Sequence, residues 1–121
     1  MTITIAFSEN SQTVSTTELS IPANTTYASG SPQTADGVFQ PWIDLAALAA
    51  GDTFRFRIYE TVRTSGGTQR KVTEAEFTGV QADPIWTGPS LVLGVGWDMT
   101  LIKIAGTDRA IPARIAQIAD S

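Results

Sequence analysis

The stretch TFRFRIYETVRTSGGTQRKVTEAEF, residues 53–77, decides the fold that we expect. Apolar side chains alternate with charged or polar ones along both of its arms, which is the pattern of a β-strand with one buried face. Gly66 and Gly67 lie at its centre and suit a two-residue type I′ turn, which needs a positive φ at both positions. The stretch therefore predicts an antiparallel β-hairpin.

The turn also predicts which residues of the two arms face each other. Phe56 would oppose Phe77 on the apolar face, and Arg57 would oppose Glu76 on the charged face. Apolar pairs and opposite-charge pairs both stabilise neighbouring strands. A slip of one residue would destroy both sets of pairs, so we expect this register.

The charge of the chain is distributed unevenly. The first 54 residues contain five acids and no base, whereas residues 55–71 contain five bases and one acid, in a chain whose net charge is −4. In the predicted hairpin, Arg63 opposes Arg70 near the tip and Lys71 opposes Val62, so these three bases have no acid opposite them. We expect them to bind a partner. A general nucleic-acid binder is basic overall, so we expect a protein partner and no nucleic acid.

The rest of the chain predicts further short strands. Turn signals recur about every ten residues, which is typical of an antiparallel β-sandwich. The segment PWIDLAALAAGD, residues 41–52, is the one predicted helix, a short connector with Asp44 as its N-cap and Gly51 at its C-terminus. The sequence therefore predicts one all-β domain over residues 1–121, an antiparallel β-sandwich of jelly-roll or immunoglobulin-like type with one short connector helix.

A second hairpin is expected near the C-terminus. Residues 94–104 and 109–118 flank a turn at Gly106. Pro112 has no N–H to donate to a ladder, which places the last strand at a sheet edge or at a bulge. Gly94 and Gly96 are interpreted as strand glycines beside Trp97.

The composition leaves little catalytic chemistry. The chain contains no cysteine and no histidine, which excludes disulfides, thiolate and imidazole metal ligands and the usual general base at neutral pH. Asp98 with Asp108, or Glu74 with Glu76, are the paired carboxylates that remain, and the glutamates are explained more simply as partners of the hairpin arginines. We expect no catalytic residue, no metal and no cofactor, and therefore no enzyme.

The three tryptophans differ in their surroundings. Trp97 lies in an apolar strand and is expected in the core, and Trp42 is expected to cover an edge of the short helix. Trp86 lies between a proline and a glycine in a predicted loop, so it is the candidate contact residue. It would contact another subunit or stack on a sugar.

Several segments together resemble a known class of proteins. DLAALAAGDTF, RIYETVR, GGTQR and GWDMTLIKIAGTDR follow one another from about residue 41 to the end of the chain. In this order they resemble small virion structural proteins of tailed bacteriophages, of the head decoration (cement) kind. The resemblance implies a β-sandwich bound on the capsid surface in many copies, often as trimers, with the major capsid protein as partner. It implies no catalytic residue.

The expected function is therefore decoration and stabilisation of a capsid by binding across its subunits. The expected partner-binding residues are Arg63, Arg70, Lys71 and Trp86. A head–tail or tail component and a carbohydrate-binding host-attachment module remain alternatives. The chain begins with a strand-like alternation and not with a signal peptide, and it has no long apolar span, so we expect synthesis in the host cytoplasm, localisation in the virion and no membrane partner.

Overall fold

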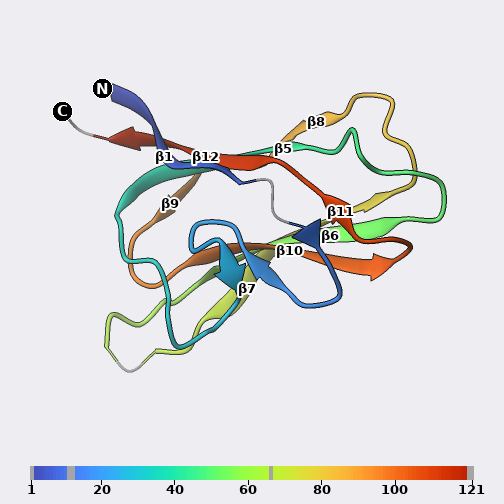
Figure 1. The fold of residues 1–121 in the computed structure, drawn as a ribbon. Helices are drawn as coiled ribbons and strands as arrows, with labels where there is room; N and C mark the ends of the chain where they lie inside the picture. The colour runs from blue at the N-terminus through green and yellow to red at the C-terminus, as the bar shows by residue number, and fades with distance from the viewer. Residues whose placement is uncertain (1, 11–12, 66, 120–121) are drawn as a thin grey trace.

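The computed structural model describes residues 2–10, 13–65 and 67–119, and their regular structure consists of β-strands alone. The strands form two layers that face each other across the core (Figure 1). Their bounds are β1 Thr2–Asn10, β2 Thr13–Val14, β3 Leu19–Ser20, β4 Thr25–Thr26, β5 Gly37–Asp44, β6 Thr53–Glu60, β7 Arg70–Thr78, β8 Ile85–Thr87, β9 Leu91–Leu93, β10 Asp98–Ala105, β11 Arg109–Ala110 and β12 Ala113–Ala119.

The strand order is that of a jelly roll. The first sheet has the order β1-β12-β5-β8, with β9 also paired to β5, and the second sheet has the order β4-β3-β10-β6-β7. All the pairings are antiparallel. When β8 and β9 are taken as one interrupted strand, and apart from the β3–β4 and β6–β7 hairpins, the chain passes from one sheet to the other between successive strands, as in a jelly roll. The predicted all-β antiparallel sandwich is confirmed.

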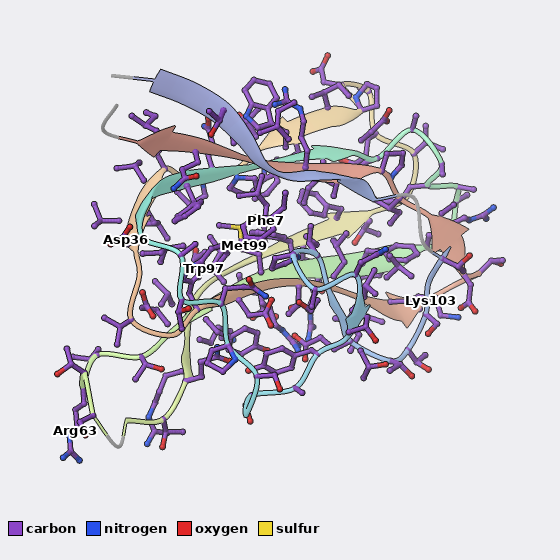
Figure 2. All side chains as sticks on the ribbon, turned by 60° about the vertical axis from the view of Figure 1, so that its left-hand side comes forward. Phe7, Asp36, Arg63, Trp97, Met99 and Lys103 are labelled. Atoms are coloured by element: carbon purple, nitrogen blue, oxygen red, sulfur yellow. The ribbon has the colours of Figure 1, made fainter. Side chains whose placement is uncertain are left out.

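Alternation along each strand builds the core. In β6, Phe54, Phe56 and Ile58 are fully buried, whereas the residues between them point to the outer face of the second sheet. In β5, Phe39 and Ile43 point inward in the same way. Trp97, predicted in the core, is fully buried and lies near Phe7 and Met99 between the layers (Figure 2).

The hairpin of residues 53–77 forms, but its predicted register is wrong by two residues. Phe54 faces Phe77, and Arg55 faces Glu76, while Arg57 faces Glu74. A shift of two leaves every side chain on its predicted face, which explains why the faces were right and the partners were not. The strands end at Glu60 and Arg70, so residues 61–69 form a long connection and not a two-residue turn; Gly66 itself lies outside the described residues.

Contacts outside the hairpin explain the long connection. The side-chain amide of Gln69 donates to the carbonyl of Gly96, and its oxygen accepts a 2.6 Å hydrogen bond from the Tyr27 hydroxyl. The Thr61 hydroxyl donates to the same Gly96 carbonyl. These hydrogen bonds hold Thr61 and Gln69 against neighbouring loops. The two residues therefore do not extend the pairing of β6 with β7 beyond Glu60. An extra residue in β7, Val72, makes a bulge at this end.

The predicted connector helix is absent from the described residues. Asp44 does accept a hydrogen bond from the backbone N–H of Ala46, at 3.0 Å, as an N-cap would. The N–H groups of Leu48 and Asp52 bond to carbonyls three positions back, so residues 45–52 form two successive turns, and the N–H of Leu45 bonds to the carbonyl of Pro84. Leu45 and Leu48 are both buried. A segment of barely two turns cannot offset the cost of helix nucleation, so its tertiary contacts decide its shape.

The second predicted hairpin is also wrong. β10 pairs with β6 and β3 in the second sheet, whereas β12 pairs with β1 and β5 in the first. The turn at Gly106, where φ is +92°, therefore leads across the sandwich through β11 and not back along the same sheet. Pro112 precedes β12, which lies in the interior of its sheet and not at an edge.

Gly94 and Gly96 lie in the loop between β9 and β10 and not in a strand. The backbone N–H groups of both glycines, and of Val95 between them, donate to the carboxylate of Glu60 at 2.8–3.4 Å. Successive backbone N–H groups that point to one side form a concave anion-binding site. In this protein the bound anion is the carboxylate of Glu60.

Candidate functional site

The outer face of the first sheet is largely apolar. β5 and β12 alternate in step across their shared ladder, so every second side chain of each points away from the core. Four large aliphatic side chains are exposed here, with Val92 the most exposed at 81%. We call this surface the open face, and it consists of Ile5, Val38, Gln40, Trp42, Asp44, Ile85, Val92, Arg114, Ala116 and Ile118.

Trp42 and Arg114 form the centre of the open face. The two residues are paired across β5 and β12, and the guanidinium carbon of Arg114 lies 4.7 Å from the centroid of the indole ring. Such a cation–π contact holds a guanidinium flat while its N–H edges stay available. Within the described part of the chain, no carboxylate forms an ion pair with Arg114.

Two shallow hollows flank this pair, and both are lined by Trp42 and Arg114. The first has a volume of about 230 Å³, and the second of about 300 Å³. The further lining residues are Ile43, Asp44, Ile85, Pro112 and Ala113 in the first hollow, and Val38, Gln40, Ser90, Ala116 and Ile118 in the second. The open face is therefore ridged, with apolar depressions into which a partner's side chains would fit.

The outer face of the second sheet is closed by hydrogen bonds. The carboxylate of Glu18 accepts hydrogen bonds from the hydroxyls of Tyr59, at 2.7 Å, and Thr100, and it lies 3.5 Å from a guanidinium nitrogen of Arg57. The ring of Tyr27 stacks on that of Tyr59 with centroids 4.7 Å apart. We call this set the polar network: Glu18, Ser20, Tyr27, Arg57, Tyr59, Asp98 and Thr100.

Asp98 is the most deeply buried acid of the polar network, with 1% of its surface exposed. Its carboxylate accepts hydrogen bonds from the Ser20 hydroxyl, at 2.7 Å, and from the backbone N–H of Met99. Burial raises the pKa of Asp98 to about 6, helped by the nearby charge of Glu18 and opposed by those two hydrogen bonds. Burial also raises the pKa of Tyr59 to about 12, together with its bond to Glu18. The polar network therefore connects β3, β6 and β10 across the outer face of the second sheet.

The three bases predicted to bind a partner, Arg63, Arg70 and Lys71, do not form one cluster. Arg63 lies on the connection of residues 61–69, exposed and far from the sandwich (Figure 2). Arg70 is exposed, but it faces Glu60 and not Arg63. Lys71 faces Tyr59 and not Val62, and its ammonium group lies 2.7 Å from the carboxylate of Glu74.

The prediction that Lys71 has no acidic partner within the chain is therefore wrong, because Lys71 forms an ion pair with Glu74. The hydrogen bonds of Lys71 and Arg57 lower the pKa of Glu74, which keeps this partner ionised. Arg63 and Arg70 form no ion pair with a described residue. We call them the basic tip from here on.

Trp86 lies in β8 and not in the loop that the sequence predicted. Its ring is partly buried and packs 5.2 Å from Phe56 and 5.1 Å from Phe77 between ring centroids. The ring therefore packs against the core, and the contact role of Trp86 stays a prediction. Trp42 was missed because residues 41–52 were interpreted as a helix. The alternation of GVFQPWID, residues 37–44, is the signal that would have placed it on an outer face.

The two carboxylate pairs differ in how the structure places them. Asp98 lies at the start of β10, whereas Asp108 follows its other end and pairs with Lys103. Glu74 and Glu76 share one face, as predicted, and bind Arg57 and Arg55. The described residues contain no group of three acids, cysteines or histidines placed to hold a metal ion. None of the described residues lies in a helix long and apolar enough to cross a membrane.

Comparisons with known proteins find structural similarity only. No protein-family model matches the chain, and no curated protein sequence matches it. Among solved structures, the Yersinia pseudotuberculosis-derived mitogen is similar with a TM-score of 0.46 and 10% identity, over 99% of this chain and 88% of that one. Eiger TNF from S. frugiperda is similar with a TM-score of 0.40 and 16% identity, over 71% of this chain and 62% of that one. The fold assignment rests on the strand order of the chain itself.

Proposed function

We propose that this protein is a structural virion protein that decorates a phage capsid and stabilises it by binding across neighbouring subunits, without catalysis. The observation that carries this proposal is the open face. Four large aliphatic side chains and a tryptophan–arginine pair share one surface of a small domain. Contiguous apolar surface of this kind marks sites of protein–protein contact.

The composition of the open face supports binding to a protein. Cores of protein interfaces are enriched in aromatic residues and arginine and depleted of other charges. Trp42 and Arg114 lie at the centre, and the hollows beside them are lined mainly by apolar side chains. The resemblance of the sequence to capsid decoration proteins supplies the kind of assembly.

The basic tip gives a second contact. Arg63 and Arg70 project from an acidic chain of net charge −4, so they would be attracted to an acidic surface of the major capsid protein. With one contact through the open face and another through the basic tip, each copy would link neighbouring proteins. Separation of the capsid subunits would then require both contacts to break, which is the mechanism of stabilisation.

The experiment is to count this polypeptide in purified phage particles and to compare the heat resistance of particles with and without it. Decoration predicts on the order of hundreds of copies, whereas a head–tail component predicts about six to twelve. Particles that lack the protein should break at lower temperature. Equal heat resistance of complete and stripped particles would refute the stabilising role.

Variants assign the contact to the open face. Val92→Glu places a charge on the open face and should abolish binding to stripped particles. Val80→Glu is the matched control, because Val80 is 73% exposed but lies in the connection between β7 and β8. Arg63→Glu with Arg70→Glu should weaken binding, most strongly at low salt. If the two valine variants bind equally, the open face is not the contact.

A further inference from the structure

The open face carries two opposite charges that do not neutralise each other. Arg114 and Asp44 both line the first hollow, and they lie diagonally across the ladder between β5 and β12. Neither forms an ion pair with another described residue. One oxygen of Asp44 accepts the N–H of Ala46, and the other accepts no hydrogen bond from a described residue.

We propose that a second copy of this chain covers the open face, related by a two-fold axis that places Arg114 of each copy against Asp44 of the other. This inference rests on the proposed function and names the partner that meets the open face: two copies joined there would bind the capsid through the basic tip of each copy. In a two-fold interface the same patch meets itself, so a cation and an anion on one patch satisfy each other twice. The axis lies in the plane of the interface and passes midway between the two residues.

The balance of charge favours a second copy over other occupants. The described side chains of the open face carry one positive and one negative charge, so a strongly acidic or basic partner would leave one of them unpaired in a desolvated contact. Each copy has a net charge of −4, and like charges repel elsewhere on the surface. Two acidic copies can therefore meet at the open face without placing like charges opposite one another there.

The aliphatic residues around the charge pair supply the rest of the contact. Ile5 and Ile118 lie toward one end of the open face, and Ile85 toward the other, with the Trp42–Arg114 ridge between them. In a two-fold arrangement the ridge of one copy enters a hollow of its partner. Water is then excluded from the charge pairs, which strengthens them.

A charge exchange tests this arrangement by sedimentation velocity of the full chain from about 1 to about 100 µM, the range in which a dimer of micromolar affinity dissociates. The unaltered protein should sediment as a dimer at the upper end. Arg114→Glu and Asp44→Arg should each raise the dissociation constant at least about tenfold, since each places like charges opposite one another. The double variant Arg114→Glu/Asp44→Arg should restore it.

Controls separate folding from association. Asp44→Asn keeps the acceptor for the Ala46 N–H, and thermal unfolding of every variant is measured beside sedimentation. A monomer at about 100 µM overturns the proposal, as does a trimer, the state that the resemblance implies. A folded double variant as weak as either single one also overturns it. If the protein is monomeric but Arg114→Glu still loses particle binding, the second-copy inference fails and the proposed function stands. If it dimerises but no particle contains it, the proposed function fails alone.

Discussion

The outer faces of the two sheets differ in how far other parts of the chain cover them. Over the second sheet, Glu18 and Tyr27 lie across the outward residues of β6 and β10, and Thr100 is completely buried although it points away from the core. Over the first sheet, the equivalent outward residues of β5 and β12 have no such cover, and the most prominent of them are apolar. One face is closed from within the chain, and the other is open.

The difference between the two outer faces shows which of them is available to bind a partner. The same two-residue alternation forms both sheets, so the pattern of one strand does not reveal whether its outer side will be covered. The polar network satisfies its own hydrogen bonds, and no buried side-chain nitrogen or oxygen among the described residues lacks a partner. None of the described residues covers the apolar side chains of the open face in the same way.

The largest effect should come from comparing two tryptophans on opposite sides of the first sheet. Trp86→Ala removes a ring that packs on Phe56 and Phe77 and should lower the free energy of unfolding by about 3–4 kcal/mol. Trp42→Ala removes an outward ring and one cation–π contact and should cost about 1 kcal/mol. Urea unfolding of both variants measures the difference. Equal losses would mean that Trp42 also belongs to the core.

The second effect concerns the carboxylate that closes the second sheet. Glu18→Ala leaves Tyr59, Thr100 and Arg57 without their shared acceptor and should cost about 2–3 kcal/mol in the free energy of unfolding. The control is Glu76→Ala, because Glu76 forms only an exposed pair with Arg55 and should cost less than about 1 kcal/mol. A loss no larger for Glu18 than for Glu76 would show that the polar network does not close this face.

The third effect is a pH dependence that belongs to Asp98. Its pKa of about 6 in the folded protein lies above the ordinary value of 3.8, so the folded state binds this proton more tightly than the unfolded state. The resulting stability is fully present below about pH 4 and is lost as pH rises through 6, an effect of about 3 kcal/mol.

Asp98→Asn keeps the oxygen that accepts the bonds of Ser20 and Met99, and it should remove this pH dependence and raise stability at pH 7.5. Chemical unfolding at several pH values from 4 to 7.5 gives the comparison. Asp52, whose pKa is lowered to about 2 by the N–H of Ala49, by Arg109 and by the N–H of Thr107, acts in a separate window, since its contribution is lost only as pH falls below about 4. Identical profiles for the variant and the unaltered protein would contradict the assignment to Asp98.

The smallest effect tests how little the fold depends on the open face. Val92→Ser should change the free energy of unfolding by less than about 0.5 kcal/mol, because the side chain is exposed in the isolated chain. At a concentration where copies associate, the same variant should instead lower the melting temperature relative to the unaltered protein. A large loss at low concentration would mean that Val92 packs within its own chain.

The sequence predicts the faces of the strands better than their partners. Alternation placed Phe56 and Ile58 in the core and Arg55 outside, because the two-residue period is a local property. The register of β6 and β7 depends instead on Gln69 and Glu60 reaching residues 94–96, which lie far along the chain. No pattern within the hairpin contains that information.

The candidate site was predicted less well, for a related reason. Arg63 and Arg70 were found because charge can be counted, whereas the open face depends on which strands become neighbours. Trp86 looked exposed because it lies between proline and glycine, yet pairing with β5 turns its ring inward. Trp42 and Arg114 are 72 positions apart in the sequence (114 − 42). They become neighbours only because β5 pairs with β12.

The central position of β12 also governs the order in which the molecule can be built. Chains emerge from the ribosome N-terminus first, and β12 lies between β1 and β5, which were made long before it. Until residues 113–119 arrive, β1 has no partner and β5 lacks one of its two neighbours, so both present bare backbone edges. The first sheet therefore cannot assemble progressively during synthesis. The first sheet is completed in one late step, when β12 inserts between the unpaired edges of β1 and β5.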